Sequence, residues 1–278
     1  MSKVALVTGV AAKHSMGRVV AMKLAENGCD VALVDKFMIP PTIRPEDKDW
    51  RGMLQIKEDI EALGQKAIAI EADLGVDADC LKIVDETVAA FGDIDYFVNC
   101  AGFRGPMKDL LEYPIEKYRQ VMDININGVF VLSQAVAKVM VKNPAGKKIV
   151  LFASQGGTEP AFKMSAYGIS KAAAIALGRS LALELAPYGI NVNSISPMAF
   201  DTNFRDAAKI QQAEEQGISI EESMKKDVAL GKGGGPVIPI GRHGTPEDAA
   251  NMVLFLISEA SSYVTGQNIL MNGGHKMQ

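Results

Sequence analysis

The chain has 278 residues, of which 48% are hydrophobic and 22% are charged, and its formal net charge is −4. This composition is ordinary for a globular protein, and an acidic balance without a basic stripe argues against a nucleic-acid partner. The apolar run near Met1 is too short for a signal peptide, and no apolar run is long enough to span a membrane. We therefore expect a single domain over residues 1–278 with no membrane partner.

The cysteine and histidine content argues against disulfides and metal sites. Cys29, Cys80 and Cys100 are odd in number and show no paired CxxC spacing, which favours a reducing compartment. The three histidines lack the spacing of metal ligands or of a hydrolase triad. We therefore expect no metal ion and a cytoplasmic location.

Short apolar runs rich in β-branched residues alternate with helical patterns along the chain. Several of these runs are apolar almost throughout, as strands are when a parallel sheet is covered on both faces. The alternation predicts a single doubly wound α/β domain of the Rossmann type, with seven parallel strands and helices on both faces. The expected strands begin at Val4, Val31, Ala67, Ile94, Lys148, Asn191 and Gln267, and the expected helices span residues 18–28, 54–64, 81–92, 127–140, 170–189 and 246–258.

The first expected strand runs into TGVAAKHSMGR and then into a helix, which is the setting of a phosphate-binding turn. Backbone N–H groups and the helix dipole favour an anion at such a helix start. Gly9 permits a tight turn, and Gly17 permits close packing of the helix on the strand. A plain turn is the alternative, but the strand and helix context favours a nucleotide.

The second expected strand ends in Asp35, 18 residues after Gly17. A carboxylate at this position accepts hydrogen bonds from the adenosine ribose hydroxyls and repels a 2′-phosphate. The sequence therefore favours NAD over NADP as the cofactor. Lys13, His14 and Lys36 lie nearby in sequence and could counter this preference.

Two segments interrupt the alternation of strands and helices. Residues 37–50 carry three prolines, which forbid a regular helix, and they directly follow Asp35. We expect them to form an inserted loop near the adenosine, where they would cover it. Residues 198–240 include GKGGGP, and long loops of this kind are usually functional lids or disordered. We expect this second segment to be a substrate lid.

The stretch SAYGISKAAA places Tyr167 and Lys171 one helical turn apart and therefore on the same helix face. A surface helix with a solvated lysine is the simpler reading. A phenol with a pKa of about 10 is a poor base at neutral pH, whereas a neighbouring ammonium favours the phenolate. We therefore expect Lys171 to lower the pKa of Tyr167 and make it a general acid–base.

Five motifs in their order and spacing resemble the short-chain dehydrogenase/reductase family over essentially the whole chain. They are NCAG from Asn99, ININGVF around Asn125, FASQGG around Ser154, YGISK from Tyr167 and SPMAFDT from Ser196. The chain departs from the family pattern at three positions. Cys100 replaces an asparagine, Met198 replaces a glycine, and the phosphate turn is two residues longer with Ser15 at the position of its middle glycine.

The resemblance implies hydride transfer between NAD(H) and a secondary alcohol or ketone, with Tyr167 as the proton carrier. It implies that Ser154 binds the substrate oxygen, that Lys171 binds the nicotinamide ribose, and that Asn125 holds a relay water. The implied catalytic residues are Asn125, Ser154, Tyr167 and Lys171. The implied cofactor-binding residues are Gly9, Ser15, Met16, Gly17, Asp35, Asp73, Leu74, Asn99, Ala101, Gly102, Tyr167, Lys171, Pro197, Phe200 and Thr202. The implied substrate-binding residues are Ser154, Tyr167 and Met198.

The resemblance leaves the substrate open, and two other functions remain. The charged and glycine-rich lid mildly favours a polar or small cyclic alcohol. One alternative is a reductase of carbon–carbon double bonds, and the other is an inactive or regulatory NAD-binding protein. Because relatives commonly assemble through the helix that carries YxxxK, we also expect a homo-oligomer, a tetramer or a dimer.

Overall fold

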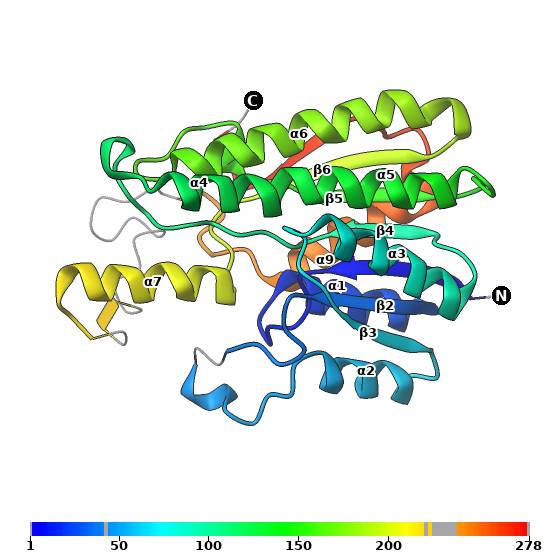
Figure 1. Ribbon diagram of the computed structural model, residues 1–278, viewed down its shortest axis with the longest axis horizontal. Helices are drawn as coiled ribbons and strands as arrows, with labels where there is room; N and C mark the ends of the chain where they lie inside the picture. The colour runs from blue at the N-terminus through cyan, green and yellow to red at the C-terminus, as the bar shows by residue number, and fades with distance from the viewer. Residues whose placement is uncertain (1, 42–43, 220–221, 224–237, 277–278) are drawn as a thin grey trace.

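The computed structural model describes residues 2–41, 44–219, 222–223 and 238–276 (Figure 1). Its centre is a parallel sheet of seven strands in the order β3-β2-β1-β4-β5-β6-β7, which confirms the predicted fold class. The strands are β1 (Lys3–Thr8), β2 (Cys29–Asp35), β3 (Ala67–Glu71), β4 (Tyr96–Asn99), β5 (Lys148–Phe152), β6 (Asn191–Pro197) and β7 (Asn268–Met271).

Strand β1 pairs with β2 on one side and with β4 on the other, so the strand order reverses at β1. Ligands of open α/β sheets bind at such a reversal, outside the carboxyl ends of the strands. Thr8 and Asn99 are register partners at these two strand ends. The topology therefore places the end of β1, the end of β4 and the phosphate turn around one crevice.

Helices cover both faces of the sheet and give the domain two hydrophobic core layers. Helices α1 (Met16–Glu26), α2 (Met53–Ala62) and α9 (Pro246–Ile257) contribute to one layer. Helices α3 (Asp77–Phe91), α5 (Gly128–Met140) and α6 (Ser165–Leu185) contribute to the other. The strands between these layers are buried on both faces, which explains their continuous apolar runs.

Local signals fix several helix boundaries. Ser15 caps α1, because its hydroxyl accepts a hydrogen bond from the Arg18 N–H at 3.1 Å. At the start of α9, the side chains of Thr245 and Asp248 form a reciprocal capping box, and Pro246 occupies the first turn. Helix α4 (Ile115–Met122) runs into α5 through a π-helical turn at Asp123–Asn127 (Figure 1).

Two regions differ from the elements expected from the sequence. Helix α4 was not expected, and helix α7 (Asn203–Gln216) lies within the segment 198–240 that was expected to be a long loop. Alternating charged and small residues hid the helical period of α7. The GKGGGP stretch lies outside the described residues.

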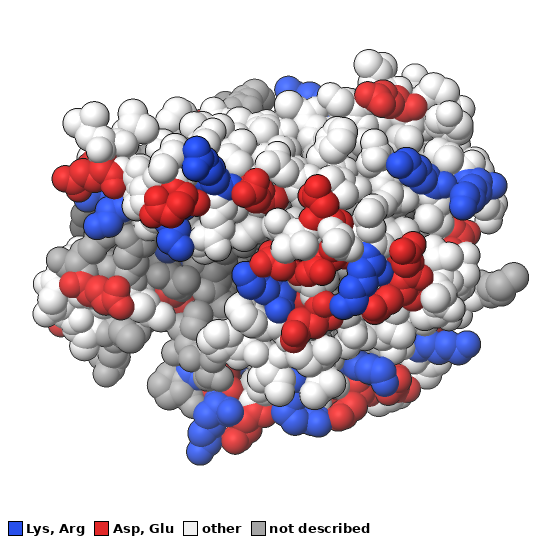
Figure 2. All heavy atoms as spheres, in the orientation of Figure 1, with Lys and Arg blue, Asp and Glu red and all other residues white. Residues whose placement is uncertain are grey.

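The inserted segment contains a short 3₁₀ turn at Pro45–Asp47, consistent with prolines that forbid a longer helix. On the face shown in Figure 2, lysines and arginines lie among aspartates and glutamates, with no surface of one sign. In the described part of the chain, no helix has both the length and the apolar character needed to cross a membrane.

Candidate active site

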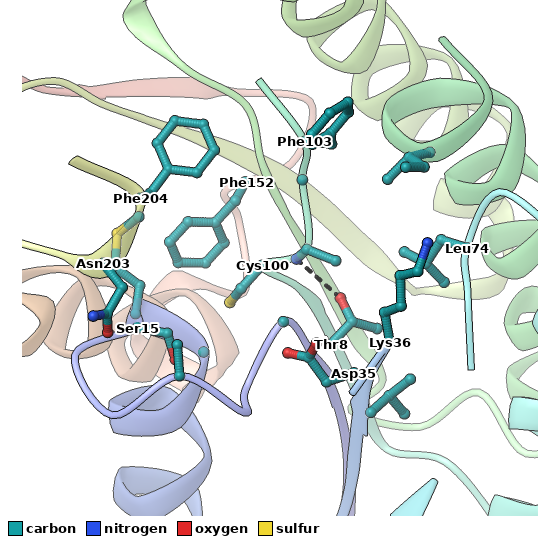
Figure 3. A pocket seen from close by; sticks show the side chains of 18 of the residues that line it. Thr8, Ser15, Asp35, Lys36, Leu74, Cys100, Phe103, Phe152, Asn203 and Phe204 are labelled. Atoms are coloured by element: carbon teal, nitrogen blue, oxygen red, sulfur yellow. Dashed lines mark hydrogen bonds between the residues drawn. The ribbon is translucent and has the colours of Figure 1, made fainter. Parts of the chain in front are cut away.

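A cavity of about 450 Å³ lies at the carboxyl ends of β1, β2, β4 and β5. In the close view, Lys36 and Leu74 lie at one end of it and Phe152 and Phe204 at the other (Figure 3). Twelve of the predicted cofactor-binding residues line this cavity: Gly9, Ser15, Met16, Gly17, Asp35, Asp73, Leu74, Ala101, Gly102, Tyr167, Lys171 and Thr202.

The turn after β1 is packed too closely for side chains at its two glycines. Gly9 has a φ of +72°, and a Cβ there would lie 2.7 Å from the backbone nitrogen of Ala101. A Cβ on Gly17 would collide with the carbonyl of Gly9. The hydroxyl of Thr8 donates to Asn99 Oδ1 at 2.8 Å and accepts from the Ala101 N–H at 3.1 Å (Figure 3). At Gly9 and Gly17, therefore, only backbone lies beside the cavity, as close approach of a dinucleotide pyrophosphate requires.

Asp35 lines the cavity, and its carboxylate accepts a hydrogen bond from the Ala11 N–H at 2.9 Å. Burial raises the pKa of Asp35, and four backbone hydrogen bonds oppose that shift. The side chains of Lys36, Lys13 and His14 lie against other carboxylates. Lys36 lies 2.7 Å from Asp73, and both Lys13 and His14 contact Asp47, at 2.8 and 2.9 Å.

Asn125 and Lys171 converge beneath the loop that follows β4. Asn125 is 1% exposed and forms two hydrogen bonds with the backbone of Phe103. Its amide oxygen accepts from the Phe103 N–H, and its amide nitrogen donates to the Phe103 carbonyl, both at 2.7 Å. The Lys171 ammonium donates to the Phe152 carbonyl at 2.8 Å. A Cβ on Gly102 would lie 3.2 Å from Lys171 Nζ and 3.6 Å from Asn125 Oδ1. The predicted residues Asn125, Lys171 and Gly102 are therefore neighbours.

The electrostatics of Tyr167 differ from the sequence-based expectation. Burial raises the pKa of Tyr167 to about 12, while a hydrogen bond with Ser154 and the positive charge of Arg104 oppose the shift. Burial also lowers the pKa of Lys171 to about 8. The Lys171 ammonium lies 5.8 Å from the centre of the tyrosine ring. The expectation that Lys171 lowers the pKa of Tyr167 is therefore wrong for the protein alone, because desolvation dominates.

A second cavity of about 340 Å³ adjoins the first at Tyr167 and Phe204. The three residues predicted to bind substrate, Ser154, Tyr167 and Met198, all line it. Ser154 Oγ accepts a hydrogen bond from the Gly156 N–H at 3.1 Å, which fixes the serine at the start of a 3₁₀ turn. The phenol and the serine hydroxyl are thus exposed to the same small cavity.

Three predicted cofactor residues lie away from the first cavity. Asn99 is buried and bonded to Thr8, so it supports the phosphate turn from below. Pro197 and Phe200 line the second cavity instead. Sequence reasoning missed Phe152, Phe204 and Arg104, which also line these cavities. Arg104 stands two residues after the NCAG motif, and that position was the only available signal for it.

The inserted segment lies mainly on the phosphate turn and on helix α7. Phe37 lines the first cavity, but Trp50 Nε1 donates to the Ala11 carbonyl at 2.7 Å, and Arg44 Nε donates to Asp206 of α7 at 2.8 Å. The expectation of a cover over the adenosine therefore does not describe residues 44–50. Among the described residues, no cluster of three or more histidine, cysteine or acidic side chains could hold a metal ion.

The chain matches known proteins over nearly its full length. A family model described as enoyl-(acyl carrier protein) reductase matches residues 9–276. The 2-dehydro-3-deoxy-D-gluconate 5-dehydrogenase of Dickeya dadantii (strain 3937) is 32% identical over 272 residues, which cover 98% of this chain and 94% of the relative. The NAD-dependent glycerol dehydrogenase of Listeria innocua is 32% identical over 281 residues, which cover 99% of this chain and 94% of the relative.

A crystal structure of NAD⁺-bound xylitol dehydrogenase matches this fold with a TM-score of 0.80 at 30% identity, covering 98% of each chain. Together, the sheet order, the site and these matches define a nicotinamide-dependent alcohol dehydrogenase. The chain belongs to the short-chain dehydrogenase/reductase family.

Proposed function

We propose that this dehydrogenase interconverts a small polar secondary alcohol and its ketone, with NAD as the preferred cofactor. One observation carries the proposal: Tyr167 and Ser154 line a small cavity that adjoins the larger cavity of Asp35 and Lys171 at the tyrosine. Relatives named for glycerol, xylitol and a deoxygluconate ketone support polyhydroxy substrates. NAD, when bound, supplies the hydride acceptor.

Ser154 and Tyr167 have different roles in the proposed reaction. Ser154 Oγ donates a hydrogen bond to the substrate oxygen and orients it. Tyr167 exchanges a proton with that oxygen, and general acid–base catalysis of this kind is worth roughly 10²- to 10⁴-fold. A pKa near 12 keeps the phenol protonated at neutral pH, ready to donate to a ketone. Asn125 holds the loop around Gly102 through its two hydrogen bonds to Phe103, and Lys171 lies beside that glycine.

NAD is preferred over NADP because Asp35 is the charged group at the adenosine end of the cavity that has no cationic partner among the described residues. A ribose 2′-phosphate would meet this carboxylate, whereas ribose hydroxyls can donate to it. Lys13 and His14 contact Asp47, and Lys36 contacts Asp73, so a 2′-phosphate would have to compete with these carboxylates for them.

The alternative functions make different use of the same residues. A carbon–carbon double-bond reductase does not require Ser154 beside Tyr167. An inactive binding protein requires neither Ser154 nor Tyr167. The test is oxidation of xylitol, D-glucitol, glycerol and 2,3-butanediol by wild type and Tyr167→Phe, followed by NADH absorbance. Turnover by wild type that is lost in the variant supports the proposal. Equal turnover by both proteins, or reduction of enoyl substrates only, contradicts it.

We further propose that the chain forms a homo-oligomer through α5 and α6, which run side by side on one side of the molecule (Figure 1). Large apolar side chains on these helices face solvent, namely Phe130, Ile169 and Leu183, which are 52%, 50% and 78% exposed. Burial of such side chains against a second copy would remove apolar surface from water. Light scattering that gave the 29.7 kDa mass of one chain would reject this assembly.

A further inference from the structure

Arg104 is a cation that lines the second cavity, called the substrate cavity from here on, and it forms no ion pair with a carboxylate of the described residues. It lines this cavity together with Ser154 and Tyr167 and does not line the cofactor cavity. Its Nε is buried without a hydrogen-bond partner, and the described residues give its guanidinium no ion pair. Burial lowers the pKa of Arg104, yet an arginine stays charged at physiological pH.

The rest of the cavity wall carries no negative charge that could offset the charge of Arg104. The described residues that line it include no aspartate and no glutamate. Arg205, the other cation of the wall, lies 3.6 Å from Asp201 and is therefore already partly balanced. The only aromatic contact of Arg104 among the described residues is with Phe204, whose ring centre lies 5.9 Å away. A buried charge that lacks a partner is unfavourable, and burial is offset when an ion of opposite sign arrives.

We propose that Arg104 selects alcohols that carry a carboxylate, such as hydroxy acids and sugar acids. A planar guanidinium binds a carboxylate through two parallel N–H···O bonds, which fixes orientation as well as charge. With Arg104 on the carboxylate and with Ser154 and Tyr167 on the reacting oxygen, the substrate is held at two points. This inference rests on the proposed function, because it assumes that the second cavity binds the reacting alcohol.

Phe204 of helix α7 also lines this cavity and contacts Arg104. Its ring contacts both Arg104 and Tyr167, with its centre 5.9 Å from the guanidinium carbon and 5.7 Å from the centre of the tyrosine ring. Helix α7 therefore contributes one wall of the space between the guanidinium and the phenol. A purely structural role for Arg104, as a cation stacked on Phe204, is the competing explanation, and it predicts no preference for acids.

The test compares matched acidic and neutral substrates. D-Gluconate is compared with D-glucitol, and 5-keto-D-gluconate with L-sorbose, in wild type, Arg104→Met, Arg104→Lys and Phe204→Leu. Arg104→Met should reduce kcat/KM for the acids roughly 10- to 100-fold more than for the neutral partners, mainly through KM, because it removes charge-assisted hydrogen bonds. Arg104→Lys should recover part of the difference. Phe204→Leu should affect both members of each pair alike.

Two outcomes overturn the inference while leaving the proposed function intact. One is a wild type that prefers the neutral members, and the other is an acid-to-neutral ratio that Arg104→Met leaves unchanged. Glycerol 3-phosphate is also compared with glycerol. A preference for glycerol 3-phosphate without a preference for the carboxylates would indicate a phosphate site, and it would likewise contradict the inference. Failure of every substrate with wild type contradicts the proposed function, and binding then decides the inference.

Binding is measured by thermal unfolding with saturating NAD in the presence of succinate or 1,4-butanediol. Succinate should raise the Tm of wild type more than the diol does, and this extra shift should vanish in Arg104→Met but persist in Phe204→Leu. An equal shift in wild type and Arg104→Met overturns the inference whether or not any alcohol is turned over.

Discussion

Arg44 in the inserted loop forms an ion pair with Asp206 on helix α7, and the aspartate side chain is only 1% exposed. Arg44 Nε donates to Asp206 Oδ2 at 2.8 Å and Arg44 Nη2 donates to Asp206 Oδ1 at 3.1 Å, while Nη2 also reaches Asp201 Oδ1 at 3.3 Å. On the other side of the loop, Asp47 holds Lys13 and His14 of the phosphate turn. The insertion thus joins the turn after β1 to helix α7.

This ion pair predicts energetic coupling between the loop and the lid. Arg44→Met leaves a buried carboxylate without its partner and should lower stability, whereas Arg44→Met with Asp206→Leu should recover part of the loss. We expect a coupling free energy of about 1–3 kcal/mol from the double-mutant cycle in denaturant. If the proposed function holds, the single variant should also raise KM for the alcohol, because Phe204 and Arg205 of α7 line the second cavity. A coupling near zero would mean that the loop and the lid move independently.

Tyr167→Phe should reduce kcat about 10²-fold or more while leaving NAD affinity within a few-fold of wild type. The variant removes one hydroxyl from a buried ring and keeps its packing against Phe204. Stopped-flow turnover and NADH fluorescence titration measure the two quantities separately. Tyr263→Phe is the matched control, because Tyr263 is fully exposed and should tolerate the change. Near-parental kcat in Tyr167→Phe would remove the tyrosine from the mechanism.

Asp35→Asn should shift the ratio of kcat/KM for NAD over NADP toward NADP by roughly tenfold, or ~1.4 kcal/mol. The substitution removes the charge that opposes a 2′-phosphate but keeps an acceptor for the Ala11 N–H. Asp30→Asn, at the opposite end of β2, should leave the ratio unchanged. If both variants keep the parental ratio, a group other than Asp35 reads the ribose.

A buried ion-pair network at the amino end of the sheet should contribute to stability. Asp95 accepts from the Val4 N–H at 2.8 Å and pairs with Lys3 and with Lys147, whose side chain is fully buried. Asp95→Asn should cost about 2–4 kcal/mol of unfolding free energy at pH 7. Burial opposes ionisation of Asp95, but the Val4 and lysine contacts outweigh it and lower the pKa.

The same carboxylate gives this prediction a pH signature. Because the folded pKa of Asp95 lies below the unfolded value, its stabilisation is present above about pH 4 and is lost as pH falls through the folded pKa. Urea unfolding at pH 7 and at progressively lower pH should therefore show a shrinking difference between wild type and Asp95→Asn. A constant difference would mean that the variant acts through packing alone.

Lys171→Met should show a pH dependence of the same sign, but in the alkaline range. The pKa of Lys171 falls to about 8 in the folded protein from 10.5 in its ordinary state, so between these values the unfolded chain binds more protons. Wild type therefore gains stability from this group as pH rises from 8 toward 10.5, and Lys171→Met does not. The Tm of wild type relative to the variant should increase between pH 7 and pH 9.5. A parallel pair of Tm curves would show that Lys171 does not titrate in this range.

The fold and most of the residues that line the first cavity were predictable because their signals are local. A buried parallel strand is apolar along its length, and Asp35 and the glycines stand at fixed offsets from strand ends. Tyr167 and Lys171 were predictable because one helical turn sets their spacing. By contrast, Asp206 meets Arg44 across 162 positions, and the pKa of Tyr167 depends on burial by several distant segments. The spacing of apolar residues along the sequence does not predict contacts between such distant segments.

The placement of the chain ends relative to the site bears on how the protein can be handled. Lys3 pairs with Asp95 at the amino end of the sheet, opposite the edge that carries the cavities. Near the other terminus, Lys276 pairs with Glu159, just beyond the 3₁₀ turn that begins after Ser154. An affinity tag or a surface linkage attached before Lys3 would therefore lie at the end of the sheet away from the first cavity, whereas Lys276 lies close to the segment that follows Ser154.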